Sequence, residues 1–267
     1  MGYGTIAFRY LLGLIQEVFY GFSSHQVATL AANLEWWHIL LAPTAGGFLV
    51  GLFLQFVMPG GKAEGVARVM EAGSLRGGRL TLRRGLAAAA VSVVSLGAGA
   101  SAGREGPVVH LGATVASFVA QRFKFGPSLA LTLLGCGVAS AVAASFNAPI
   151  AGVFFALEVV IGHYALHAFT PIVIASVAST IVSRIHLGDF PAFVHPDYSI
   201  ISFFELPAFL LLGIVCAAVA IIFMWSIIVT TDTVERTKLP IWLRPTVGGL
   251  CVGAIAILFP PRSGRRL

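Results

Sequence analysis

Long apolar segments separated by short polar breaks constrain this chain more than any other feature. A helix needs about 20 apolar residues to cross a bilayer, and several segments reach that length. Only 10% of the 267 residues are charged and 57% are hydrophobic, whereas soluble domains carry roughly 25% charged residues. The sequence therefore predicts an all-α integral membrane protein. The segments are 2–22, 37–58, 85–102, 108–119, 127–146, 150–161, 170–185, 203–229 and 246–259.

The formal net charge of +6 comes largely from two basic clusters, at 68–84 and 262–266. In a soluble protein such clusters would favour nucleic acid. Beside membrane segments they are typical of cytoplasmic flanks, because cytoplasmic loops carry an excess of Lys and Arg. We therefore expect a multi-pass protein whose surrounding partner is the lipid bilayer and not nucleic acid. As its location we expect a bacterial inner membrane.

The cysteines indicate neither disulfides nor a metal site. Cys136, Cys216 and Cys251 lie far apart, each inside an apolar segment. Three thiols without ligand-type spacing give no disulfide framework and no zinc motif. We expect them to be small buried hydrophobic residues, and we expect no metal, no cofactor and no enzymatic activity.

Two segments, 108–119 and 150–161, are too short to cross a bilayer alone. Each follows a Gly/Pro break, GREGP at 103–107 and NAP at 147–149. Non-helical backbone at membrane depth is tolerated only where protein or a water-filled cavity satisfies its polar groups. Half-helices of this kind aim their amino termini at a transported substrate. The pattern predicts a bundle of tilted and re-entrant helices around a transport site.

Two charges stand inside the first break. A helix that begins at Pro107 exposes unpaired N–H groups and about half a positive charge. Gly103 and Gly106 let the backbone approach an anion, and Arg104 adds positive potential. Glu105 would occupy the anion site when ionised and leave it when protonated, which makes it a gate. The alternative is a structural Arg104–Glu105 pair that caps a helix at the membrane surface.

A dinucleotide-binding site is the other hypothesis for this region. GAGASA at 97–102 fits G-x-G-x-x-A after an apolar run. That fingerprint requires an acidic residue about 20 residues further on. No Asp or Glu occurs between Glu105 and Glu158, so we reject this alternative.

GREGPVVHLGA at 103–113 and ASAVAASFNAPIAGVFFALEVV at 139–160 resemble the CLC family of chloride channels and chloride/proton antiporters. The first matches the family's G-[KR]-E-G-P motif residue for residue, and the likeness extends over essentially the whole chain. The resemblance implies two inverted repeats with the anion site at their interface. It also implies that Glu105 is the external gating glutamate, and that each subunit of a homodimer has its own pore. Anion-binding positions would be Gly103, Arg104, Gly106 and Pro107, and the helices that form the dimer would include 170–185.

The second anion-facing motif of the family, G-S-G-I-P, is poorly kept. Its counterpart is AEGVA at 63–67, which retains Gly65 and replaces Ile by Val66. Glu64 stands where the family has a serine, and it would repel an anion unless protonated or paired with Lys62. The alternative is a surface Lys62–Glu64 pair, with the anion site elsewhere.

A further departure concerns proton coupling. Family antiporters carry two successive glutamates, and the second accepts the proton from inside. Here Glu158 is followed by Val159, as in the family's channels, so Val159 occupies the acceptor position. His163 is either another proton route or a structural residue. The resemblance thus implies glutamate-gated conduction of small anions, chloride first, like a voltage-gated chloride channel. The alternatives are a proton-coupled antiporter for chloride or fluoride, and a non-conducting relative.

The resemblance also gives the organisation of the chain. We expect residues 1–267 to form a single transmembrane region, with about 1–190 as the first repeat and 203–259 as the start of the second. The family's G-x-F-x-P half-helix and pore-lining tyrosine have no counterpart in this sequence. We therefore expect residues 1–267 by themselves not to conduct.

Overall fold

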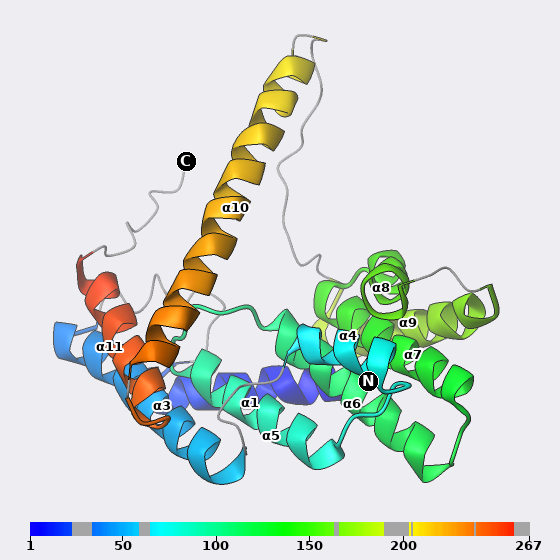
Figure 1. Ribbon diagram of the computed structural model, residues 1–267, viewed down its shortest axis with the longest axis horizontal. Coiled ribbons are helices and arrows are strands. Elements are labelled where there is room, and N and C mark those ends of the chain that lie inside the picture. The colour runs from blue at the N-terminus through cyan, green and yellow to red at the C-terminus, as the bar shows by residue number, and fades with distance from the viewer. Residues whose placement is uncertain are drawn as a thin grey trace. The chain divides into compact units, whose positions relative to one another are not determined.

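The computed structural model describes residues 1–22, 34–58, 65–162, 166–189, 203, 205–237 and 239–258, with only the backbone of Leu166. Across these ranges the secondary structure is helical, and no strand occurs in them (Figure 1). The chain divides into two compact units. One comprises Met1–Ala192 and Ile241–Leu267, and the other comprises Phe193–Pro240.

The first unit holds most of the helices. They are α1 (Gly2–Tyr20), α3 (Trp36–Val57), α4 (Val66–Leu75), α5 (Leu82–Gly97), α6 (Glu105–Arg122), α7 (Pro127–Phe146), α8 (Pro149–Phe155), the π-helical turn η1 (Ala156–Ile161), α9 (Leu166–Leu187) and α11 (Leu243–Leu258). The second unit holds α10 (Glu205–Arg236). In the described ranges, four helices are long and apolar enough to cross a membrane, namely α3, α7, α9 and α10. The predicted all-α, multi-pass membrane class is confirmed.

Helix α7 is the centre of the first unit, since it packs against α6, α8 and α9. Leu134 of α7, Leu157 of η1 and Ile172 of α9 are fully buried in the shared core. Hydroxyl groups add hydrogen bonds between helices: Ser179 Oγ donates to Ser140 O at 2.8 Å, and Ser183 Oγ donates to Ala144 O at 3.0 Å. Such bonds help hold helices together in lipid, where the hydrophobic effect does not drive helix association.

Helices α6 and α7 touch through their backbones. A Cβ atom on Gly112 would lie 2.5 Å from the Gly137 carbonyl oxygen and 2.9 Å from Ala141 Cβ. The same kind of contact joins α3 to α11, where a Cβ on Gly253 would lie 2.9 Å from Leu40 Cα (Figure 1). Small residues permit this approach between membrane helices.

Helix α6 differs from the prediction at both ends. It begins at Glu105 instead of Pro107 and runs for 18 residues to Arg122, about 27 Å at 1.5 Å per residue. Helix α6 is nevertheless not among the described helices that are long and apolar enough to cross a membrane, which agrees with the prediction that segment 108–119 does not cross alone. An acidic residue suits the positive first turn of a helix, and at the other end Gln121 Nε2 donates to Leu80 O at 2.8 Å. Helix α8 and η1 together, Pro149–Ile161, are also shorter than a membrane span, as predicted.

Several features of the sequence analysis lie outside the described residues. They are Lys62, Glu64, His163, the loop 190–202 and the basic tail 262–266.

Candidate functional site

Two helix starts converge at the position where the sequence predicts an anion site. Helix α4 begins at Val66 after Gly65, and α6 begins at Glu105 after Arg104. A Cβ on Gly106 would lie 3.9 Å from Val66 Cγ2, so the two starts are in contact. Neither residue that precedes a start, Gly65 or Arg104, caps its helix with a side-chain hydrogen bond. Each start presents first-turn N–H groups and about half a positive charge to the same region.

A hydrogen bond from α1 fixes the non-helical stretch 98–104 between α5 and α6. Helix α5 ends at Gly97, and Tyr20 Oη of α1 donates to Ala98 O at 2.9 Å. Gly99 follows with a φ of 98°, a conformation that a residue with a side chain adopts only with strain. The chain then runs without helix or strand to Arg104, with a tight turn in which Ala102 N donates to Ala100 O at 2.9 Å, and Gly103 is exposed. This break lies where the sequence predicts it.

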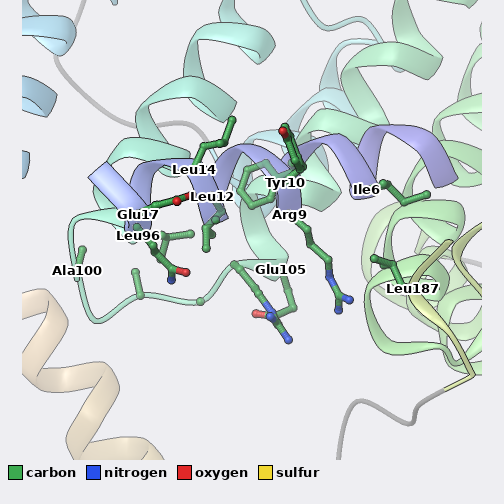
Figure 2. Close-up of a pocket in the computed structure, with 16 residues that line it drawn as sticks. Ile6, Arg9, Tyr10, Leu12, Leu14, Glu17, Leu96, Ala100, Glu105 and Leu187 are labelled. Atoms are coloured by element: carbon green, nitrogen blue, oxygen red, sulfur yellow. The ribbon is translucent and has the colours of Figure 1, made fainter. Parts of the chain in front are cut away.

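A cavity of about 770 Å³ opens beside the break, between it and α1 (Figure 2). Gly103, Arg104 and Glu105 line one side of it, and Arg9 and Glu17 of α1 line the other. Arg104 Nε lies 3.4 Å from Glu105 Oε1, and these side chains are 38% and 36% exposed. The Glu105 carboxylate is thus accessible from the cavity.

Arg9 is the functional candidate that the sequence analysis missed. Its Nη2 donates to Ser145 O at 2.9 Å, in the last turn of α7. Its charge is repelled by Arg104 and attracted by Glu105, so all three belong to one electrostatic cluster. In Figure 2 the Arg9 and Glu105 side chains reach into the same cavity from α1 and from α6. The missed signal was a lone arginine within an apolar segment, which is a functional candidate by default.

The second break, at 147–149, is fixed by a polar network. Asn147 ends α7 with a φ of 56°, and its Oδ1 accepts from Arg184 Nε at 2.7 Å. Asn147 Nδ2 donates to Asp189 Oδ1 at 2.8 Å. Ser176 Oγ donates to Pro149 O at 2.7 Å, so α9 also fixes the first residue of α8. These contacts set the direction in which the short helix α8 leaves α7.

The position of the predicted proton acceptor lies in the π-helical turn η1. Glu158 is exposed there, whereas Val159 is half-buried and packs against the core around Leu134. A valine has no titratable group, so position 159 cannot accept a proton. Nor do the described residues contain a group of three or more side chains suited to hold a metal ion.

Comparisons with known proteins give one family. Residues 46–266 match the family model described as voltage gated chloride channel. A putative chloride channel protein ClcB-like from Ralstonia nicotianae is 35% identical over 96% of this chain, and chloride channel protein CLC-e from Arabidopsis thaliana is 36% identical over 85% of it. The chain spans 60% of the first relative's length and 33% of the second's.

Solved structures share the fold. A slow cyanobacterial chloride/proton antiporter superposes with a TM-score of 0.80 at 22% identity, covering 97% of this chain and 61% of that one. A CLC-type fluoride/proton antiporter superposes with a TM-score of 0.71 at 24% identity, covering 97% and 65%. At these identities the likeness shows the fold alone. With the family model matched over most of its length, this chain belongs to the voltage-gated chloride channel family, the CLC family of membrane proteins.

Proposed function

We propose that the protein carries small inorganic anions, chloride first, across a membrane along a pathway gated by Glu105. The observation that carries the proposal is the contact between two helix starts, at Val66 of α4 and in the first turn of α6 at Gly106, beside a cavity that holds the Glu105 carboxylate. Relatives named as chloride channel proteins support chloride as the anion.

The charge of the site explains how a carboxylate can gate it. The two helix starts stabilise negative charge, and the Glu105 carboxylate is the negative group nearest to them on α6. An ionised Glu105 competes with the anion for these donors. Protonation removes the competing charge, and the exposure of Glu105 to the cavity supplies a route for the proton. The anion-binding positions of this proposal are Gly103, Arg104, Gly106 and Pro107 on one start, with Glu64, Gly65 and Val66 at the other.

The distribution of basic residues orients the pathway. Arg79, Arg83 and Arg84 follow α4, and Arg122 and Lys124 lie at the end of α6 opposite Glu105. Loops rich in Lys and Arg face the cytoplasm. The cavity beside Glu105 therefore opens away from the cytoplasm, and Glu105 gates the outer end of the pathway. Bacterial relatives favour a bacterial inner membrane as its location.

A second copy of the chain is the proposed partner of α9. Ile174, Ile181 and Ile185 are exposed on this helix at spacings of seven and four residues, so they share one face. An apolar face of this kind suits a helix of a second subunit, as the family's homodimer implies.

Passive conduction is favoured over proton-coupled exchange because position 159 holds a valine. The second candidate is an antiporter for chloride or fluoride, because the solved structures that share this fold include antiporters for both anions. The reversal potential across an imposed proton gradient separates the two. A value at the anion equilibrium potential indicates conduction, and a shift with the proton gradient indicates coupling.

The gate is tested with Glu105→Gln in the protein expressed from its complete reading frame and reconstituted in liposomes. Wild-type chloride efflux should rise as the pH falls over the roughly two units that a single titrating group spans. Glu105→Gln should remove this dependence and keep efflux high at neutral pH. Glu17→Gln, which removes a carboxylate from the same cavity on α1, should retain the pH dependence. Loss of the pH dependence in both variants, or in neither, would refute Glu105 as the gate.

A further inference from the structure

A second cavity, of about 310 Å³, lies at the end of α6 opposite Glu105. It is formed where the α4–α5 connection meets the α6–α7 connection. Gly78 and Arg79 line it from the first connection, Lys124 and Phe125 line it from the second, and Gln121 lines it from the last turn of α6. The mechanism proposed for Glu105 makes no use of these residues.

Hydrogen bonds hold the α4–α5 connection against α6. Ser117 Oγ of α6 donates to Gly78 O at 2.7 Å and accepts from Leu80 N at 2.7 Å. Gln121 Nε2 donates to Leu80 O at 2.8 Å. The backbone that carries Arg79 is thus fixed against α6, and the cavity is a built feature of the fold.

The charges that line this cavity are all positive. Arg79 and Lys124 are exposed, and neither forms an ion pair with a residue that the structure describes. The nearby acid Glu71 is already engaged, at 2.6 Å by Arg68 and at 2.9 Å by Arg76. Lys124 has a φ of 55°, which is uncommon for a residue other than glycine. Lys124 is the left-handed residue of the turn that ends α6, where Phe125 N donates to Ala120 O at 3.0 Å.

The surroundings are those of a membrane–water interface. Phe123 and Phe125 flank Lys124, their ring centroids are 5.8 Å apart, and they are 66% and 38% exposed. Exposed aromatic rings beside cations are typical of the headgroup level of a bilayer. By the excess of Lys and Arg this end of the chain faces the cytoplasm, where the leaflet contains anionic lipids.

We propose that this cavity binds a phosphate ester, presented by the headgroup of an anionic phospholipid of the cytoplasmic leaflet. Arginine and lysine are the side chains that bind phosphate oxygens, through charge-assisted hydrogen bonds. The volume lies at the lower end of the roughly 300–1,000 Å³ of small-molecule sites, which suits a headgroup and excludes acyl chains. The stacked Phe123 and Phe125 rings lie beside the lipid's glycerol and first methylene groups.

The test compares two double variants of the full-length protein in detergent, titrated with short-chain phosphatidylglycerol or phosphatidylcholine. Arg79→Gln/Lys124→Gln removes the two cations of the cavity. Arg83→Gln/Arg84→Gln removes two exposed cations of the same basic region that do not line it. The first pair should lose about tenfold or more in affinity for phosphatidylglycerol, and the second about twofold or less. Phosphatidylcholine should bind weakly to every form.

Equal losses in both double variants would show diffuse attraction to a basic surface and overturn the proposal. Unchanged affinity of Arg79→Gln/Lys124→Gln for phosphatidylglycerol would overturn it as well. Thermal unfolding in detergent is measured for each form, so that a loss of affinity is scored on protein as stable as the wild type. Inorganic phosphate and glycerol phosphate are titrated in parallel. If they bind as tightly as the lipid, the lipid source is overturned in favour of a soluble phosphate ester. The readout is binding and not flux, so it is independent of whether Glu105 is the gate.

Discussion

Replacing Gly112 by alanine tests whether the backbone contact between α6 and α7 positions the helix start at the anion site. The added Cβ would lie 2.5 Å from the Gly137 carbonyl oxygen and 2.9 Å from Ala141 Cβ. Carbon atoms pack best at about 3.5–4.0 Å, so α6 must move away from α7 by roughly 1 Å. The obstructing oxygen belongs to the backbone of a helix, and it cannot rotate away as a flexible side chain would.

The loss of stability expected for Gly112→Ala follows from two opposing effects. Overpacking of this kind costs about 1–3 kcal/mol, and more where the backbone itself is the obstacle. Alanine in a helix interior is favoured over glycine by about 1 kcal/mol, which offsets part of that cost. A net loss of about 2 kcal/mol lowers the apparent Tm by roughly 4–8 °C for a chain of this size. The displaced α6 should also reduce anion flux, because Gly106 moves relative to Val66.

The assay is thermal unfolding of the purified protein in detergent at one scan rate, since unfolding of a membrane protein is often irreversible. Gly248→Ala is the matched control, because Gly248 also lies within an apolar helix, α11, and a Cβ there has no atom within 4 Å. The control should leave the Tm unchanged or raise it slightly. A Gly112→Ala protein that is as stable as the control would show that α6 and α7 do not touch through their backbones.

Three further predictions concern the charged and polar groups. Arg9→Gln removes a cation that attracts Glu105 in the same cavity, so the pH dependence of efflux should differ from that of the wild type; an unchanged pH dependence would remove Arg9 from the gate. The Arg68 guanidinium, through its hydrogen bond, holds the pKa of Glu71 below its usual value. The pair therefore stabilises the fold fully above the unfolded-state pKa of this carboxyl, and the stabilisation is lost as the pH falls through the lowered folded-state pKa. The Tm values of wild type and Glu71→Gln, plotted against pH, should converge on acidification, and parallel curves would contradict this. Asn147→Ala should cost about 1–2 kcal/mol through lost hydrogen bonds and a strained positive φ, whereas Asn147→Gly should lose less because glycine tolerates that φ; equal Tm losses would argue against strain.

Much of the fold could be predicted because its signals are local. The segment 127–146 coincides with α7, and the break before Glu105 lies where GREGP predicts it. Helix α6 begins before the predicted Pro107 and extends past the apolar segment 108–119, because the prediction followed hydropathy. Polar residues such as Gln121 and Arg122 remain helical at the membrane surface, where other groups satisfy them.

The candidate site was predicted in part. The motif at 103–107 named Glu105 and its neighbours, because their chemistry is written in adjacent residues. Arg9 was missed, since its relation to Glu105 depends on how α1 lies against the end of α7. Its hydrogen-bond partner Ser145 is 136 residues away along the chain.

The sequence by itself determined that this protein lies in a lipid bilayer, and it determined the family to which the protein belongs. A charged fraction of 10% and the repeated apolar segments require a membrane, and GREGP marks a broken helix. Only the tertiary structure decided which charges meet: Arg9 with Arg104 and Glu105 at one end of α6, and Arg79 with Lys124 at the other. The physical reason is that hydropathy and helix periodicity act over neighbouring residues. The charge at a site is instead set by helices that pack side by side from distant parts of the chain.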